Sequence, residues 1–151
     1  MPLFNGSLAV ASPTIAALAP IPENHSADGG NVAPAITFSG APQGTVEFAL
    51  ICHDPDAPLP SGFTHWTVYG IPAGASGVEL SAEGVREGPS GIGGHGWTGP
   101  QPPVGHGPHH YYFWLYALNR HVDGEPTREE FLRDYADAVI EQARLVGTFE
   151  R

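Results

Sequence analysis

Glycine and proline interrupt this sequence so often that few long regular elements can form in it. The chain of 151 residues contains 20 Gly and 16 Pro, and both residues disfavour helix interiors and central strand positions. Clusters of turn-forming residues separate short apolar runs, and they lie at positions 28–31, 39–44, 58–62 and 73–77. This spacing is typical of short antiparallel strands and excludes a helical bundle. We therefore predict one mainly β domain over residues 1–151.

Hydrophobic patterning predicts the main elements. Three runs of apolar, β-branched and aromatic residues are predicted to form central strands, at 46–52, 64–71 and 111–118. Residues 87–108 are rich in Gly and Pro, so we predict a long loop there, of the kind that often carries function. Thr127 and Glu130 form a capping-box pattern before apolar residues at helical spacing, which predicts a C-terminal amphipathic helix over 128–145.

The charge balance limits the partners. Six Arg, no Lys and 16 acidic residues give a formal net charge of −10, which repels nucleic acid and anionic bilayers, so an anionic ligand needs a local pocket. Pro13 interrupts the only apolar N-terminal run, which lacks a basic flank, so we expect no signal peptide and no integral membrane segment. Cys52 is the only cysteine, which excludes an internal disulfide and agrees with a cytoplasmic location.

Aspartates and histidines lie where the predicted strands end. The segment 54–58 reads Asp-Pro-Asp-Ala-Pro, and its prolines restrict both carboxylates. His65 lies within one predicted strand, and His109 and His110 precede another. A carboxylate from this segment that held one ring nitrogen of a histidine would leave the other free to donate. Together with a tyrosine hydroxyl and loop N–H groups, such histidines would bind a small anion, phosphate or carboxylate.

Several alternatives stay open. The aspartates could cap a turn, and each histidine could be a satisfied core residue. A metal site is the main competing interpretation, with candidate ligands His53, His65, His106, His109, His110, Asp54 and Asp56. However, the chain lacks paired cysteines, His-Glu-x-x-His and His-x-His, and His106-x-x-His109 alone is a weak pattern, so we predict neither a metal nor another cofactor. No Gly-x-Ser-x-Gly motif is present, and Cys52 lies in an apolar run where a thiol is inert.

The aromatic residues divide into two groups. Most lie on the predicted strands and are expected to pack in the core, namely Trp66, Phe113, Trp114 and Tyr116. Trp97 lies in the glycine-rich loop. We therefore expect Trp97 to line the mouth of the pocket, or else to fold over the site with its loop.

Several separated motifs also occur in a fixed order. They are Asp54-Pro55-Asp56-Ala57-Pro58, His65-Trp66, Ile71-Pro72, Gly99-Pro100-Gln101-Pro102-Pro103 and His109-His110-Tyr111. With these motifs the sequence resembles the phosphatidylethanolamine-binding protein family, in its bacterial branch of Raf kinase inhibitor-like proteins, over nearly the whole chain. The resemblance implies a β-sandwich in which a large antiparallel sheet packs on a smaller one, with flanking helices and an anion pocket.

The resemblance also implies which residues form that pocket. The ligand-binding residues would be Asp54, Pro58, His65, Gln101, Pro102, His109 and Tyr111. The supporting residues would be Asp56, Trp66, Trp97, Gly99 and His110. His110 stands where the family usually has Arg, so a titratable group replaces a fixed positive charge there.

These considerations predict a regulatory protein that binds a small anion. His65, His109 and Tyr111 would act as donors, and Asp54 would orient them. One alternative is an enzyme that uses Asp54, His65 and His109 for acid/base chemistry on a small anionic or carbonyl substrate. Another is a protein-interaction module, such as a kinase-inhibitor-like regulator with a protein partner, and apolar edge strands would allow a homodimer.

Overall fold

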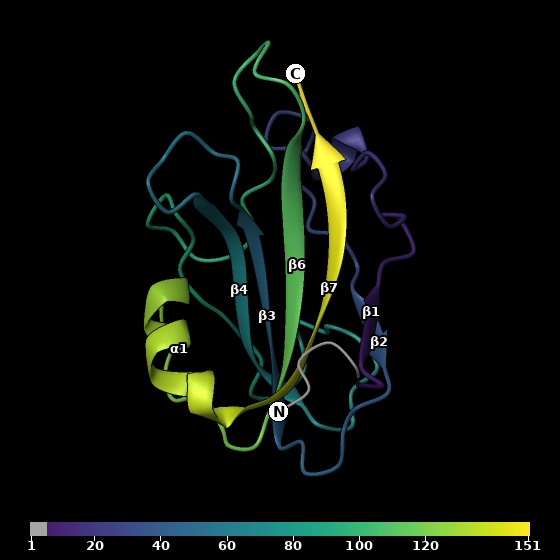
Figure 1. The fold of residues 1–151 in the computed structure, drawn as a ribbon, viewed down its shortest axis with the longest axis vertical. Helices are drawn as coiled ribbons and strands as arrows, with labels where there is room; N and C mark the ends of the chain where they lie inside the picture. The colour runs from purple at the N-terminus through teal and green to yellow at the C-terminus, as the bar shows by residue number, and fades with distance from the viewer. Residues whose placement is uncertain (1–5) are drawn as a thin grey trace.

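Five strands form the larger of two antiparallel sheets in the computed structural model, which describes residues 6–151 (Figure 1). Their order across the sheet is β5 (Arg86–Glu87), β4 (Phe63–Pro72), β3 (Glu47–Asp54), β6 (His109–Leu118) and β7 (Val139–Phe149). The smaller sheet pairs β1 (Ala9–Ala11) with β2 (Thr37–Ser39). The predicted mainly β architecture with a large and a small antiparallel sheet is therefore confirmed.

The three predicted central strands correspond to β3, β4 and β6. Strand β3 lies in the middle of the large sheet and is buried along its whole length. Its alternate residues enter two different cores: Leu50 and Cys52 join one, and Ala49 and Ile51 join the other. Because both faces are covered, the strand is a nearly continuous apolar run rather than an alternating one.

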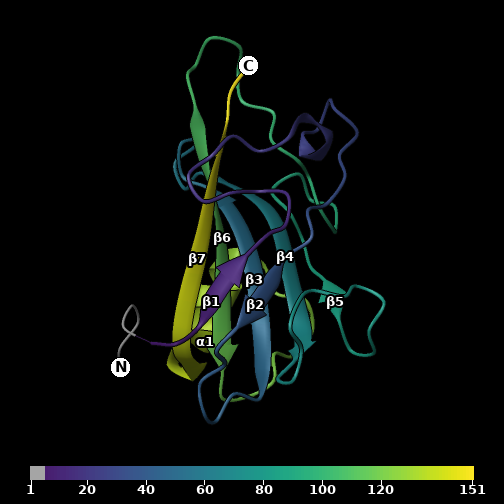
Figure 2. The same ribbon diagram turned by 90° about the vertical axis from the view of Figure 1, so that its right-hand side faces the viewer.

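Different layers cover the two faces of the large sheet. In Figure 1 the helix α1 (Arg128–Tyr135) lies to the left of the sheet, and β1 and β2 lie to its right; Figure 2 shows the small sheet from its outer side. Phe131 of α1 contacts Tyr69 and Tyr116 on one face, with ring centroids 5.7 and 5.2 Å apart. On the other face, Phe38 of β2 packs on Phe48 of β3 at 4.8 Å.

The predicted C-terminal helix is correct only at its beginning. The capping box is present, since Thr127 Oγ1 accepts from the Glu130 N–H and the Glu130 carboxylate accepts from the Thr127 N–H. However, α1 ends at Tyr135, a short 3₁₀ turn covers Ala136–Ala138, and β7 follows. The expectation of a helix through residue 145 was wrong because residues 139–149 pair with β6 over its full length, which satisfies the backbone groups of that strand.

The predicted long loop is present, but Trp97 within it does not lie where we expected. No helix or strand lies between β5 and β6 in this described part of the chain. Trp97 is buried, stacks on Phe113 at 6.0 Å and contacts Trp66 at 5.4 Å. Its indole N–H donates to the His25 carbonyl at 3.0 Å. Trp97 therefore anchors the loop in the core and does not line the mouth of the pocket.

The other predicted core aromatics divide by face. Trp66, Phe113 and Tyr116 are buried as expected. Trp114 is only half-buried, and it stacks between Tyr112 and Tyr116 while Arg144 lies over its ring. No helix within residues 6–151 is long and apolar enough to cross a membrane.

Candidate functional site

A pocket of about 330 Å³ lies at the end of the large sheet where β3 ends and β4 and β6 begin. The seven residues predicted to bind a ligand all line it: Asp54, Pro58, His65, Gln101, Pro102, His109 and Tyr111. Residues of the loop before β6 close one side, where the Pro102 carbonyl accepts from Arg151 Nε at 2.7 Å. Three strands and two loops thus bring together side chains that are more than 50 positions apart in the sequence.

A β-bulge turns His65 toward this pocket. Cys52 of β3 pairs with Trp66 of β4, but the next residue, His53, pairs with Thr64, so His65 is an extra residue on β4. Such an insertion breaks the alternation of the strand and re-aims one side chain. As a result His65 lies on the same side of the sheet as its neighbour Trp66: Trp66 packs in the core, and His65 lines the pocket and contacts the Tyr111 ring at 5.1 Å.

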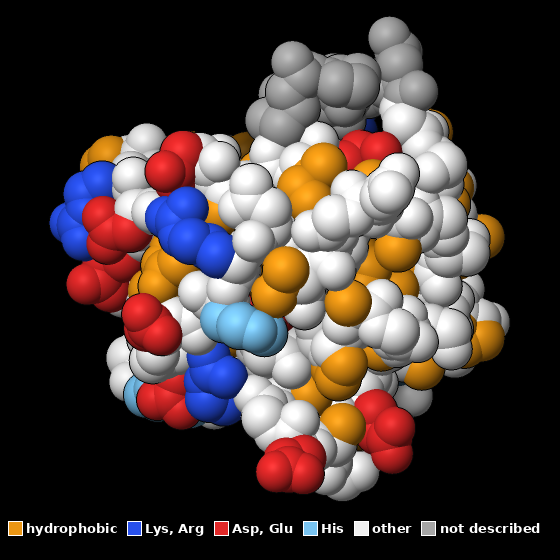
Figure 3. All heavy atoms as spheres, turned by 90° about the horizontal axis from the view of Figure 1, so that it is seen from below, with side chains coloured by type: hydrophobic (Ala, Val, Ile, Leu, Met, Phe, Trp, Pro, Cys, Tyr) orange, Lys and Arg blue, Asp and Glu red, His pale blue; other side chains and the backbone are white. Residues whose placement is uncertain are grey.

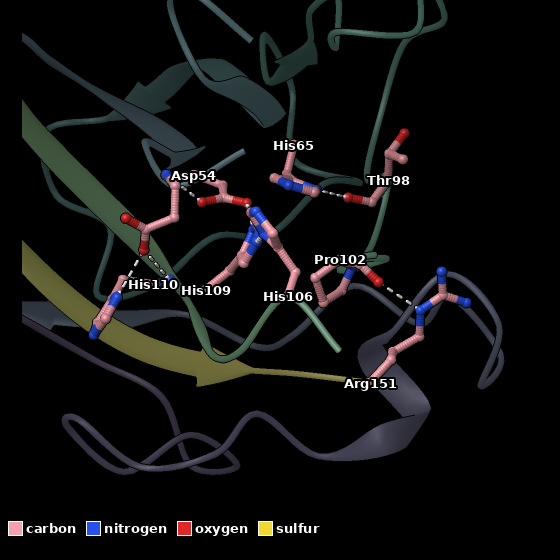
Figure 4. Close-up of polar contacts among 9 residues, drawn as sticks. Asp54, His65, Thr98, Pro102, His106, His109, His110 and Arg151 are labelled. Carbon is pink, nitrogen blue, oxygen red and sulfur yellow. Dashed lines mark hydrogen bonds and ion pairs between the residues drawn. The ribbon is translucent and has the colours of Figure 1, made fainter. Parts of the chain in front are cut away.

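The ring of His65 has a fixed tautomer. Its Nδ1 lies 2.6 Å from the Thr98 carbonyl oxygen, so this nitrogen carries the proton and donates (Figure 4). Burial lowers the pKa of His65 to about 4, against the opposing effects of this hydrogen bond and of Asp54. The ring is therefore neutral at pH 7, and Nε2 presents a lone pair. In this tautomer Nε2 of His65 accepts, which differs from the donor role that we expected for His65.

A second histidine is held by a buried carboxylate. His109 Nδ1 lies 2.7 Å from Asp54 Oδ2, and both side chains are about 2–3% exposed. The other Asp54 oxygen accepts from the Asp56 N–H at 2.8 Å. His109 Nε2 lies 2.6 Å from His106 Nδ1, so the three side chains form a row (Figure 4). In this arrangement His109 has no free ring nitrogen, in contrast to the donor that we expected.

The Tyr111 phenol and the placement of the arginines complete the electrostatics of the pocket. Burial, reinforced by the Asp54 charge, raises the pKa of Tyr111 well above its ordinary value, so the phenol remains a potential donor. None of the six arginines lines the pocket. Arg120 and Arg133 instead pair with Asp137 and Asp134 in and after α1. Figure 3 shows the molecule from below, with basic and acidic side chains gathered together on the left side of that view.

The predicted supporting residues lie in three places. Gly99 lines the pocket, whereas Trp66 and Trp97 are core residues behind His65. His110 and Asp56 lie outside the pocket and form an exposed pair, Nδ1 to Oδ2, at 2.7 Å. Although burial raises the pKa of Asp56, the hydrogen bonds from His110 outweigh this effect and lower it.

Sequence reasoning missed Thr98 and the role of His106. Thr98 acts through its carbonyl oxygen, which any residue type supplies, so its identity gave no signal. The loop at Thr98 is held by Asn31, whose side chain donates to the Trp97 carbonyl at 3.1 Å and accepts from the Gly99 N–H at 2.7 Å. The spacing His106-x-x-His109 by itself indicates no more than a weak metal pattern. Apolar residues of the wall, Leu59, Phe63 and Ile92, also went unpredicted.

The candidate metal ligands and the single cysteine lie in different surroundings. Within residues 6–151, no three side chains of His, Cys, Asp or Glu are grouped so as to hold a metal ion. Of the proposed metal ligands, His53 bonds to Thr64 Oγ1 at 3.1 Å and is turned away from the pocket. Cys52 is fully buried, and burial raises the pKa of its thiol.

Comparison with known proteins agrees with this architecture. Residues 11–150 match the family described as phosphatidylethanolamine-binding protein. A protein of Methanothermobacter thermautotrophicus, UPF0098, is 36% identical over 140 residues, which cover 87% of this chain and 91% of that protein. LppC of Mycobacterium tuberculosis, named as a lipoprotein, is 42% identical over 147 residues, covering 95% of this chain and 72% of LppC. The crystal structure of YbcL from Escherichia coli superposes with a TM-score of 0.90 at 31% identity, covering 97% and 99% of the two chains.

The two-sheet fold, the ordered motifs and these matches together define the class, and the chain belongs to the phosphatidylethanolamine-binding protein family. The predicted family resemblance is therefore confirmed. Since one relative is named as a lipoprotein, the cytoplasmic location stays a prediction.

Proposed function

We propose that this chain is a regulatory binding protein whose pocket takes a small ligand with a protonated anionic group, of the phosphate monoester type. The observation that carries this proposal is the hydrogen bond from His65 Nδ1 to the Thr98 carbonyl, because it leaves His65 Nε2 as an acceptor in the pocket. No buried side-chain nitrogen or oxygen of the described residues lacks a partner, so Nε2 is accessible from the pocket rather than sealed in the core.

A phosphate monoester monoanion complements this set of groups. Its P–OH donates to His65 Nε2, and its P–O⁻ oxygens meet the Tyr111 phenol and Nε2 of His109, the nitrogen that the His106 ring contacts in the free protein. The buried Asp54 holds the other nitrogen of that ring at 2.7 Å. With no arginine in the pocket, a fully ionised dianion lacks compensating charge, so the monoanion is the favoured form.

The experiment that tests this proposal is isothermal titration calorimetry with ethyl phosphate and diethyl phosphate. Monoesters lose their second proton near pH 6, so the monoanion fraction of ethyl phosphate, and with it the affinity, is expected to rise about 25-fold from pH 7.5 to pH 5.5. The diester has no P–OH and is expected to bind at least about fivefold more weakly at pH 5.5, which is the loss of one hydrogen bond. Equal affinity for the two esters, or an affinity for ethyl phosphate that does not change with pH, contradicts the proposal.

A matched pair of variants assigns the binding to the pocket. His65→Phe keeps an aromatic ring and removes the acceptor, so it is expected to weaken ethyl phosphate binding about tenfold. His121→Gln serves as the control, since this exposed histidine pairs with Glu47 at 3.0 Å and lies in a different part of the molecule. If both variants bind like the wild type, the ligand occupies another site.

The Asp54–His109 pair also favours a second candidate, an acid/base enzyme acting on a small anionic or carbonyl substrate. A buried carboxylate that orients an imidazole is a common arrangement for proton transfer. Turnover in a panel of phosphate monoesters and small carbonyl compounds, abolished by Asp54→Asn in a folded variant, would replace the binding-only function by this one.

A further inference from the structure

His106 occupies the one ring nitrogen of His109 through which that residue would reach a ligand. Asp54 holds Nδ1 of His109 at 2.7 Å, and His106 Nδ1 lies 2.6 Å from its Nε2. His109 lines the pocket, whereas His106 is not a lining residue and reaches His109 from the loop before β6. The position next to Nε2 that an anionic oxygen would take is thus filled by a side chain of the protein itself.

The proton count determines when this contact is stable. Asp54 accepts from the Nδ1–H group of His109. A single proton between His109 Nε2 and His106 Nδ1 then makes a hydrogen bond, because one of these two nitrogens donates it and the other accepts it. When both rings are doubly protonated, two N–H groups and two positive charges face each other, and the contact is lost. The charged and titratable groups around His109 are Asp54 on β3, Asp56 after it, His65 on β4 and His106 in the loop.

The segment that carries His106 is attached at few points. It belongs to the loop that protrudes at the top of Figure 1 before β6. Gly105 and Gly107 flank His106 with φ of 77° and 85°, and Val104 is 78% exposed. Two backbone hydrogen bonds hold this segment. The Gly105 N–H donates to the Arg151 carbonyl at 2.9 Å, and the His106 N–H donates to the Pro103 carbonyl at 3.1 Å. Such a segment rearranges at small cost, since little apolar contact area holds it.

We infer that His106 is a built-in competitor of the ligand: its ring caps His109 Nε2 in the free protein and leaves when an anionic oxygen takes its place. This inference rests on the proposed function, because the displaced position is that of the phosphate oxygen. Binding therefore includes the release of His106, and acidification, by protonating both imidazoles, favours the released state.

The test compares His106→Ala with Val104→Ala, an exposed neighbour in the same loop. Removing the competitor is expected to tighten ethyl phosphate binding about fivefold at pH 7.5 and to leave a smaller difference from the wild type at pH 5.5, whereas Val104→Ala binds like the wild type. An unchanged or weakened affinity in His106→Ala overturns the inference, and weakening would make His106 a ligand donor. Failure of the wild type and of His106→Ala to bind ethyl phosphate contradicts the proposed function itself.

A ligand-free measurement tests the contact on its own. In NMR spectra at pH 7.5, the Nε2 resonance of His109 is expected to differ between the wild type and His106→Ala, because the variant lacks the ring that contacts this nitrogen at 2.6 Å. An unchanged Nε2 resonance overturns the inference, whatever the binding data show.

Discussion

At the residue scale, the site shows which part of its chemistry could be predicted from residue types. The sequence indicated that Asp54, His65, His109 and Tyr111 would lie together, and they line one pocket. It did not indicate which nitrogen of each imidazole is free. That property depends on partners outside the motifs, the Thr98 carbonyl for His65 and the His106 ring for His109.

His65 should make the stability of the protein depend on pH. Its pKa is about 4 in the folded state and near 6.5 in an unfolded chain. Between these values the unfolded chain binds the proton and the folded protein does not, so the free energy of unfolding falls as the pH falls. From pH 7 to pH 5 the expected loss from this residue is about 2 kcal/mol. Urea unfolding at both pH values measures it.

His65→Phe provides the comparison for that measurement. The variant lacks the titrating group, so its free energy of unfolding should fall about 2 kcal/mol less than that of the wild type over the same pH interval. All other titrating groups are common to both proteins and cancel in the difference. Parallel pH profiles would mean that His65 takes up its proton in the folded protein as readily as in the unfolded chain.

At the scale of elements, patterning predicted the buried strands well and β7 poorly. The central strands are short apolar runs bounded on both sides by turn-forming residues, a pattern that favours strands over helices. Residues 138–146 instead carry apolar residues at a spacing that fits both a helix and a twisted edge strand. These residues form a strand rather than a helix because they pair with β6, which lies more than 20 residues earlier in the chain. The local sequence pattern does not indicate this pairing.

Gly70 is expected to be essential to the paired region of β3 and β4. It lies at an irregularity in their register, has φ of 75°, and an added Cβ would lie 2.0 Å from the Gly84 carbonyl oxygen. Gly70→Ala should lower the free energy of unfolding by more than about 2 kcal/mol, since both strain and a backbone clash oppose it. The nearby Gly74→Ala, with nothing within 4 Å of the new Cβ, should change it by less than about 0.5 kcal/mol. Urea titration measures the free energy of unfolding of both variants. A similar decrease in Gly70→Ala and Gly74→Ala would contradict the expected role of Gly70.

At the scale of the whole molecule, the pocket depends on contacts that span the chain. The loop at Thr98 is positioned by Asn31 and by the bond from Trp97 to the His25 carbonyl, 72 residues away. Such contacts form only when the complete fold is present, which is why the placement of Trp97 could not be predicted from its loop composition. They also imply that the pocket and the core unfold together rather than separately.

Cys52 offers a direct measure of that cooperativity. It lies in the middle strand, paired with Trp66 and Phe113, is fully buried, and burial raises the pKa of its thiol. Reaction with the thiol reagent DTNB should therefore require global unfolding and be at least about a thousandfold slower in the native protein than in the unfolded chain. Urea below the unfolding transition should accelerate labelling. The free energy of opening derived from the labelling rate should fall with urea concentration with the same slope as the free energy of global unfolding. Labelling that urea does not accelerate would show that the sheet opens locally around β3, and the pocket at its end would then not share the stability of the core.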